Sequence, residues 1–163
     1  MGNKISNLKS SLSFTGHRIV HNPDQTRQKV REISLELIQK GVTSFLVGGA
    51  LGFDAISSEE ILKIRQTKSG IGLTVVLPCR FEAFTLKWSG EEKQRLKNIM
   101  SGATETVVLQ ENYTQDCYKK RNQYLADNSG YCVCYYDLAK FKSGTGQAVR
   151  MAGRNNLTII NLF

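Results

Sequence analysis

The chain has 163 residues, of which 40% are hydrophobic and only two are proline. This length suits one domain and is short for two well-buried ones, and the composition is unlike that of a disordered chain. Twenty-two Lys and Arg residues stand against 14 Asp and Glu, so the formal net charge is +8. Such a charge favours anionic partners, including nucleic acid, although a solvated basic surface explains it equally well.

The start of the chain is polar. No run of about 18 uncharged apolar residues occurs, so we expect neither a membrane span nor a signal peptide. Gly2 and Ser6 fit the short and common N-myristoylation pattern. We therefore expect a cytoplasmic protein with a flexible leader over residues 1–10 and a single domain over residues 11–163.

From there, short apolar runs alternate with longer stretches in which apolar residues recur at helical spacing. No linker or repeat interrupts the alternation. In chain order, the predicted elements are a strand at 12–15, a helix at about 24–41, a strand at 44–47, a helix ending near 69–70, a strand at 72–77, a helix at about 90–100, a strand at 106–109, a helix at about 115–128, a strand at 131–135, a helix beginning over 146–153 and a strand at 157–160.

Apolar strands separated by helices are typical of a parallel sheet that is covered on both faces. Right-handed crossovers place every strand-to-helix loop at the same edge of such a sheet, and ligands bind outside the carboxyl ends of the strands. We therefore predict a Rossmann-like, open and mostly parallel α/β sheet with helices on both faces. The functional residues are expected in its strand-to-helix loops.

Three of these loops carry residues suited to an anionic ligand. Thr15-Gly16-His17-Arg18 offers a close backbone approach and a forked cation for phosphate, or it is an ordinary turn with an exposed Arg. The Gly48–Asp54 loop has three glycines before a helix, whose positive end attracts phosphate. Asp54 either caps that helix or accepts hydrogen bonds from ribose hydroxyls. Ser143-Gly144-Thr145-Gly146 forms a second such cradle, or a flexible turn.

Two further positions are open to two interpretations. Arg121-Asn122 lies inside a predicted helix, where the Arg either clamps phosphate or is an ordinary surface residue. Trp88 either stacks on a base or anchors the loop after the third strand, and we favour the anchor. His21 shows no functional pattern.

The sequence contains no recognisable catalytic or metal-binding set. It has no nucleophile elbow, no serine motif with a His/Asp pair and no C-x-x-C pair or histidine at metal-ligand spacing. Cys132 and Cys134 alternate in an apolar run, so a strand would point both to one buried face. We interpret all four cysteines as structural, as expected in a reducing compartment.

The loop motifs occur in one order together with Leu77-Pro78-Cys79 and Trp88. This combination, from about Leu12 to Ile160, resembles the YpsA-like branch of the SLOG superfamily, which is named after the SMF/DprA and LOG proteins. The resemblance implies a Rossmann-like fold and a pocket for a nucleotide-derived ligand. LOG relatives are phosphoribohydrolases with a helical Arg, which Arg121 matches. Gln147 and Ala148 stand where LOG proteins place their acids, and an amide cannot act as a general acid or base.

The sequence thus favours binding, and possible sensing, of a nucleotide-derived small molecule such as ADP-ribose over catalysis, with no metal and no certain cofactor. An N-glycosidic hydrolase acting on nucleoside monophosphates is the enzymatic alternative. DprA relatives bind single-stranded DNA, and single-stranded nucleic-acid binding and homo-oligomer formation are further alternatives. The expected ligand-binding residues are Thr15, Gly16, His17, Arg18, Gly48, Gly49, Gly52, Asp54, Arg121, Asn122, Ser143, Gly144, Thr145 and Gly146.

Overall fold

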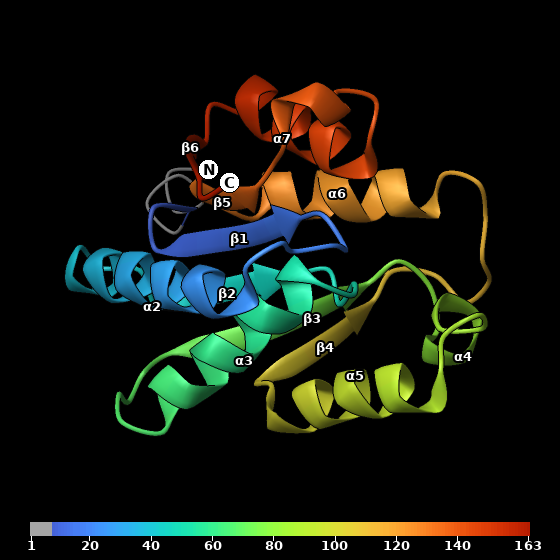
Figure 1. Ribbon diagram of the computed structural model, residues 1–163, viewed down its shortest axis with the longest axis horizontal. Helices are drawn as coiled ribbons and strands as arrows, with labels where there is room; N and C mark the ends of the chain where they lie inside the picture. Colours follow the sequence, from blue (N-terminus) through green and yellow to red (C-terminus); the bar gives the residue numbers. More distant parts are fainter. Residues whose placement is uncertain (1–7) are drawn as a thin grey trace.

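A computed structural model describes residues 8–163 of the chain. Its centre is an open sheet of six parallel strands in the order β4-β3-β2-β1-β5-β6 (Figure 1). The strands are β1 (Ser11–Gly16), β2 (Ser44–Val47), β3 (Gly72–Leu77), β4 (Glu105–Val108), β5 (Tyr131–Tyr135) and β6 (Thr158–Asn161).

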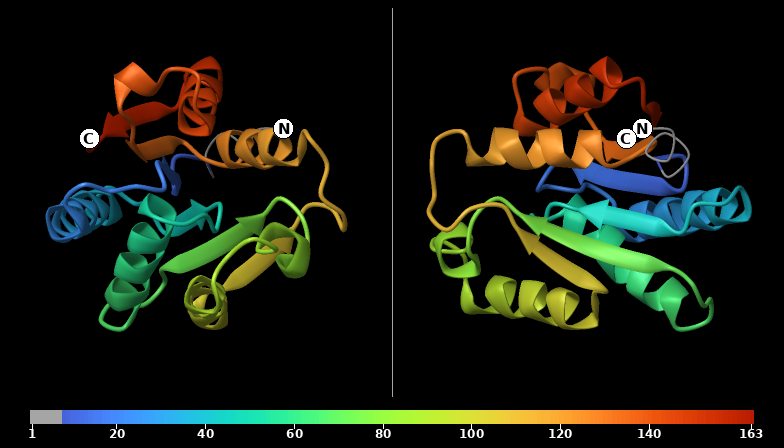
Figure 2. Two further views of the ribbon diagram at one scale, coloured as in Figure 1. Left: turned by 45° about the vertical axis from the view of Figure 1, so that its right-hand side comes forward. Right: turned by 180° about the vertical axis from the view of Figure 1, so that it is seen from behind.

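Helices cover both faces of this sheet, as Figure 2 shows from two directions. They are α2 (Pro23–Gln39), α3 (Phe53–Arg65), the short α4 (Phe81–Phe84), α5 (Gly90–Gly102), α6 (Cys117–Asp127) and α7 (Gly144–Arg154), with a 3-10 turn at Leu138–Lys140. The main core joins α2, α3 and α5 to one face. Smaller cores place α6 under β2 and β3, and α7 under β5, on the other face.

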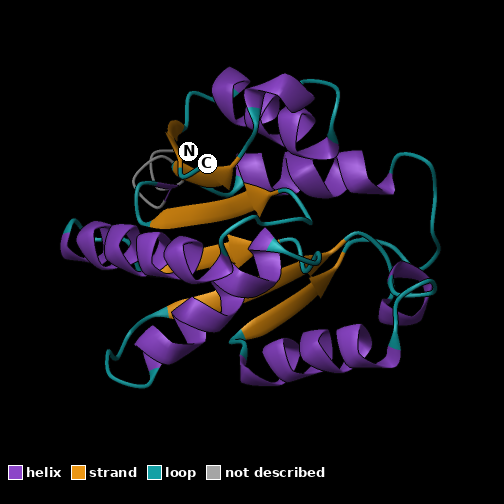
Figure 3. Cartoon of the chain, viewed as in Figure 1, coloured by secondary structure: helices purple, strands orange, loops and turns teal. Residues whose placement is uncertain are grey.

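The strand order changes direction at β1, because the strands that follow β1 are added first on one side of it and then on the other. Phe14 of β1 pairs with Val47 of β2 on one side and with Val133 of β5 on the other. From β1 the chain moves outward through β2, β3 and β4, and α6 then returns it to β5 (Figure 3). The carboxyl ends of β1 and β5 are therefore a topological switch point, where open α/β sheets hold their ligands.

The predicted fold class is confirmed, and the sheet is parallel throughout. Predicted and observed element boundaries agree closely, and Cys132 and Cys134 lie in one buried cluster, as expected. Two short elements were not predicted, namely α4 and the turn at Leu138–Lys140. The last helix begins at Gly144 and not at Gly146, because the Ser143 side chain caps it by accepting from the Gly146 amide.

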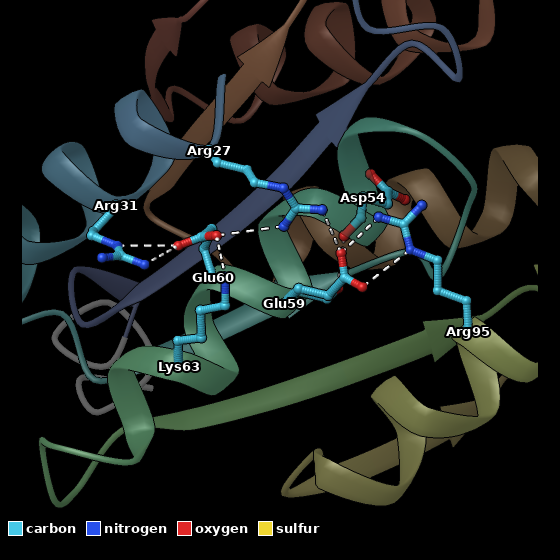
Figure 4. A network of polar contacts seen from close by, with 8 residues as sticks. Arg27, Arg31, Asp54, Glu59, Glu60, Lys63 and Arg95 are labelled. Atoms are coloured by element: carbon cyan, nitrogen blue, oxygen red, sulfur yellow. Dashed lines mark hydrogen bonds and ion pairs between the residues drawn. The ribbon is translucent and has the colours of Figure 1, made fainter. Parts of the chain in front are cut away.

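An ion-pair network ties α2, α3 and α5 together (Figure 4). Glu60 of α3 is buried and accepts from Arg27 and Arg31 of α2 and from Lys63 of its own helix. Its neighbour Glu59 bridges Arg27 to Arg95 of α5 at 2.9 and 2.6 Å. These contacts hold the helix that follows the Gly48–Asp54 loop against both of its neighbours.

The possible myristoylation residues, Gly2 and Ser6, lie outside the described residues. Between residues 8 and 163, no helix combines the length and the apolar character that crossing a membrane requires.

Candidate ligand pocket at the switch point

A pocket of about 430 Å³ opens where β1 and β5 end. It is formed by the loop after β1, the loop after β2, the first turns of α6 and the start of α7. Its lining residues are Thr15, Gly16, His17, Arg18, Ala50, Asp54, Tyr118, Arg121, Asn122, Ser143, Gly144, Thr145 and Gln147. Ten of the fourteen predicted site residues are among them. Segments more than 100 residues apart in the sequence therefore meet at one site.

His17 has a structural contact inside the pocket wall. Its Nε2 accepts a hydrogen bond of 3.0 Å from the Asp137 amide, so the ring is neutral with its proton on Nδ1. Burial, followed by the charge of Lys140, lowers the pKa of His17, while Asp137 acts in the opposite direction. His17 thus holds the segment that leads into α7. Arg18 next to it is exposed at the pocket mouth, where its guanidinium is accessible to a ligand.

The glycines of the Gly48–Asp54 loop allow close packing within the protein. A side chain at Gly48 would clash with the Arg121 guanidinium, and one at Gly52 would clash with the Arg18 carbonyl. Gly52 also has φ of 74°, which glycine adopts without strain. Gly49 faces core side chains of β3 and α5. Gly48, Gly49 and Gly52 shape the loop and do not line the pocket, and only Ala50 and Asp54 of this segment reach it.

Asp54 is a buried carboxylate at the floor of the pocket, with 5% of its surface exposed. Its Oδ2 accepts from the Ala50 amide at 3.1 Å, whereas Oδ1 has no hydrogen-bond partner among the described residues. Gly52, not Asp54, is the N-cap residue of α3. Burial raises the pKa of Asp54 from 3.8 to about 6, although Arg121, the loop amides and Arg18 favour the ionised form.

Arg121 is buried next to Asp54 and does not lie on the surface. Its Nη1 donates to the Gly48 carbonyl and its Nε to Asn122 Oδ1, while its guanidinium lies over the Tyr118 ring, 5.6 Å from the centroid. Burial lowers the pKa of Arg121, and Asp54 opposes that shift. Arg121 thus joins α6 to the β2 loop and provides a fixed positive charge at the pocket floor.

The start of α7 supplies backbone donors. The amides of Gly144 and Thr145 are the first two of the helix, so they have no intrahelical carbonyl to bind. Gly144 has open space in front of its Cα, and Thr145 is buried against the pocket. Gly146 does not line the pocket, because its amide binds Ser143 and a Cβ there would meet the Phe141 carbonyl. This end of α7 fits an anionic group.

Three lining residues were not predicted: Ala50, Tyr118 and Gln147. Tyr118 lies three residues before Arg121 on α6, a spacing that puts both on one helix face. Gln147 follows Gly144 at the same spacing. Helical periodicity, counted from Arg121 and from Gly144, therefore predicts that Tyr118 and Gln147 lie on the same helix faces as those two residues.

Across residues 8–163, His, Cys, Asp and Glu side chains form no group of three or more that would hold a metal ion. All four cysteines are free and buried.

The parallel sheet and the pocket at its switch point place the chain in the Rossmann-like class of doubly wound α/β domains. Within that class, the chain belongs to the YspA SLOG family (YpsA), whose pattern matches residues 24–162. The predicted SLOG resemblance is therefore confirmed.

Individual relatives share limited sequence identity with this chain. The UPF0398 proteins of Staphylococcus epidermidis and Halalkalibacterium halodurans are 24% and 27% identical over 62% and 65% of the chain. The matched regions cover 54% and 56% of these two proteins, so the chain spans about half their length. The SPbeta prophage-derived protein YoqJ of Bacillus subtilis is 25% identical over 81% of the chain and 85% of its own length.

Two solved structures share the fold. DNA processing protein A from Helicobacter pylori, whose single-stranded DNA binding mode has been described, superposes with a TM-score of 0.64 at 18% identity, over 97% of this chain and 67% of its own. TM1055 superposes with a TM-score of 0.58 at 15% identity, over 92% of this chain and 72% of its own.

Proposed function

We propose that this chain binds a nucleotide-derived ligand such as ADP-ribose in the switch-point pocket, as a binding or sensing domain. The observation that carries the proposal is Asp54, a buried carboxylate with one free oxygen beside the buried Arg121. A free buried acceptor destabilises the empty protein, and a ribose hydroxyl is the kind of donor that would satisfy it.

The remaining groups of the pocket suit the phosphate of such a ligand. The Gly144 and Thr145 amides begin α7, and Arg18 offers a forked donor at the mouth. The buried Arg121 adds a positive charge at the pocket floor. Ser143 lines the same wall, but its hydroxyl donates to the Lys140 carbonyl and accepts from the Gly146 amide, so it holds the start of α7 and does not serve as a phosphate donor. Donors for an anion thus face an acceptor for hydroxyls, which is the combination that a phosphorylated sugar requires. A cytoplasmic location is part of the proposal, supported by the four free cysteines.

A hydrolase is the second candidate, and Asp54 is again the reason. A pocket carboxyl with a pKa of about 6 is able to exchange protons near neutral pH, as a general acid or base must. Gln147 lines the pocket near the position where the resemblance to LOG proteins implies acids, and its amide cannot take that role. Asp54 would then have to act alone, which makes binding without turnover the better-supported function.

A thermal-shift screen tests the proposal. The panel contains ADP-ribose, NAD, nucleoside monophosphates, cyclic nucleotides and short oligonucleotides, and a ligand of the native state raises the melting temperature by mass action. We expect a small nucleotide-derived ligand to stabilise the protein and Arg121→Lys, which keeps the charge but not the fork, to reduce the effect.

Other results of the same screen would contradict the proposal. Stabilisation by oligonucleotides alone, growing with strand length, would favour nucleic-acid binding through the +8 charge, the property described for the H. pylori structure. The hydrolase needs a separate assay: incubation with nucleoside monophosphates that releases free base, with the release lost in Asp54→Asn, would establish it. No stabilisation by any compound would remove nucleotides of these classes from the pocket.

A further inference from the structure

A second pocket, of about 610 Å³, lies beside the switch-point pocket, and Arg18 is the one residue of the fourteen predicted for the ligand that lines it. It is formed at the carboxyl ends of β3 and β4, by α4, the segment leading into α5 and the segment before α6. Arg18 and Tyr118 line both pockets, so the two are neighbours with a shared wall. A ligand that binds Arg18 is therefore within reach of both.

The lining of this second pocket is aromatic. Phe84 and Trp88 lie with ring centroids 5.0 Å apart, Phe84 lies 6.1 Å from Tyr118, and Tyr118 lies 6.1 Å from Tyr113. Trp88 packs against the main core from one side and lines the pocket with the other, so it anchors its loop and still presents a ring. Tyr113 is 56% exposed and has free surface to offer.

We propose that this aromatic pocket holds the nucleobase of the ligand whose phosphorylated sugar occupies the switch-point pocket. This inference rests on the proposed function and adds the class of ligand, a molecule in which a nucleoside is joined through its phosphates to a second ribose. Aromatic side chains bind nucleobases by stacking, and they do so for any base, because every base has a flat aromatic face. Lys87 and Glu92 line the same pocket and offer a donor and an acceptor for the edge of a base.

A third hollow, of about 550 Å³, competes for the same role, because Arg18 lines it as well. It contains no aromatic side chain, and it shares Arg18 but not Tyr118 with the switch-point pocket. Two of its cations, Arg27 and Arg95, are already paired with Glu59. The chemistry of the linings therefore assigns the base to the pocket at Trp88.

The test uses Trp88 as its reporter, because it is the only tryptophan of the chain. ADP-ribose and ribose 5-phosphate are titrated by calorimetry and by tryptophan fluorescence into the wild type, Tyr113→Ala and Phe163→Ala. Phe163 is a matched control, since it is 53% exposed and lines neither pocket. We expect ADP-ribose, but not ribose 5-phosphate, to change the Trp88 emission. Tyr113→Ala should weaken ADP-ribose binding about five- to a hundredfold, as expected for lost base stacking, and leave ribose 5-phosphate binding unchanged.

Three results would overturn the inference, and they are distinguishable. If ADP-ribose binds with unchanged Trp88 emission and unchanged affinity in Tyr113→Ala, the base lies elsewhere while the proposed function stands. If Tyr113→Ala weakens both compounds equally, Tyr113 supports the fold of the shared wall and not a base. If neither compound binds the wild type, the proposed function fails and this inference fails with it.

Discussion

Asp54 is the residue at which stability and the proposed function conflict. Its carboxylate is buried, one oxygen is unsatisfied, and burial raises its pKa from 3.8 to about 6. An acid whose pKa is higher in the folded state than in the unfolded state binds more protons when folded between those two values. Ionisation therefore costs the folded protein stability as the pH rises from about 4 to 6, and the cost persists above that range.

Asp54→Asn should reveal this cost. The difference between 3.8 and about 6 corresponds to about 3 kcal/mol. The free energy of unfolding of the variant, relative to the wild type, should therefore be higher by up to about this amount at pH 7 than at pH 4. Denaturant titrations at both pH values measure the difference, with the exposed Asp24→Asn as control. A relative stability that does not change with pH would show that Asp54 is not a buried ionised group.

The charged residues that line the pocket were predictable from the sequence, but the contacts that these residues make within the protein were not. Arg18, Asp54 and Arg121 were identified because each follows a strand or matches the family pattern. That Arg121 is buried against Gly48 depends on the approach of α6 to the β2 loop, which no local pattern encodes. The loop glycines were assigned to a ligand, whereas the structure gives Gly48 and Gly52 packing partners within the protein.

Among the helices, α3 carries both the end of the glycine loop and the acids of the ion-pair network. Glu60 is 1% exposed and is surrounded by Arg27, Arg31 and Lys63, and hydrogen bonds from Arg31 and Lys63 lower its pKa against the effect of burial. An acid with a lowered pKa contributes stability above its ordinary value of 4.5 and loses it as the pH falls.

Glu60→Gln should therefore destabilise the protein at neutral pH by about 2–3 kcal/mol, since three cations lose their shared partner. Glu36→Gln is the matched control, because Glu36 forms an exposed pair with Lys40 that contributes little. The cost of Glu60→Gln should shrink below about pH 4.5, as the wild-type Glu60 becomes protonated. Urea titrations measure both variants, and equal effects of the two substitutions would mean that the network does not hold α2 to α3.

The elements themselves were largely predictable, because strands such as β3 and β5 are continuous apolar runs with the length of a buried strand. The exceptions have a common cause. The four residues of α4 span about one helical turn, which is too short to show a periodic pattern. The start of α7 depends on the Ser143 cap, and a glycine-rich segment favours a turn as much as a helix until that hydrogen bond is known.

Across the whole molecule, strand order decides where the pocket lies. β1 lies between β2 and β5, so the loops after β1, β2 and β5 and the start of α6 meet at one point of the sheet edge. The net charge of +8 is a property of the whole chain, and it attracts any anion at long range. Binding of a ligand in the pocket must therefore be distinguished from long-range attraction to the positive charge of the protein. Removing one positive charge at the pocket and one away from it makes this distinction.

Calorimetric titration of ADP-ribose into the wild type, Arg18→Gln and Arg154→Gln makes this comparison. Arg18 lies at the mouth of the switch-point pocket, whereas Arg154 is exposed at the far end of α7 and does not line it. Each substitution removes one positive charge. We predict that the wild type and Arg154→Gln bind alike and that Arg18→Gln binds about tenfold more weakly or worse, as for a lost charged hydrogen bond. Equal losses in both variants, or no binding to the wild type, would contradict a nucleotide site at this pocket.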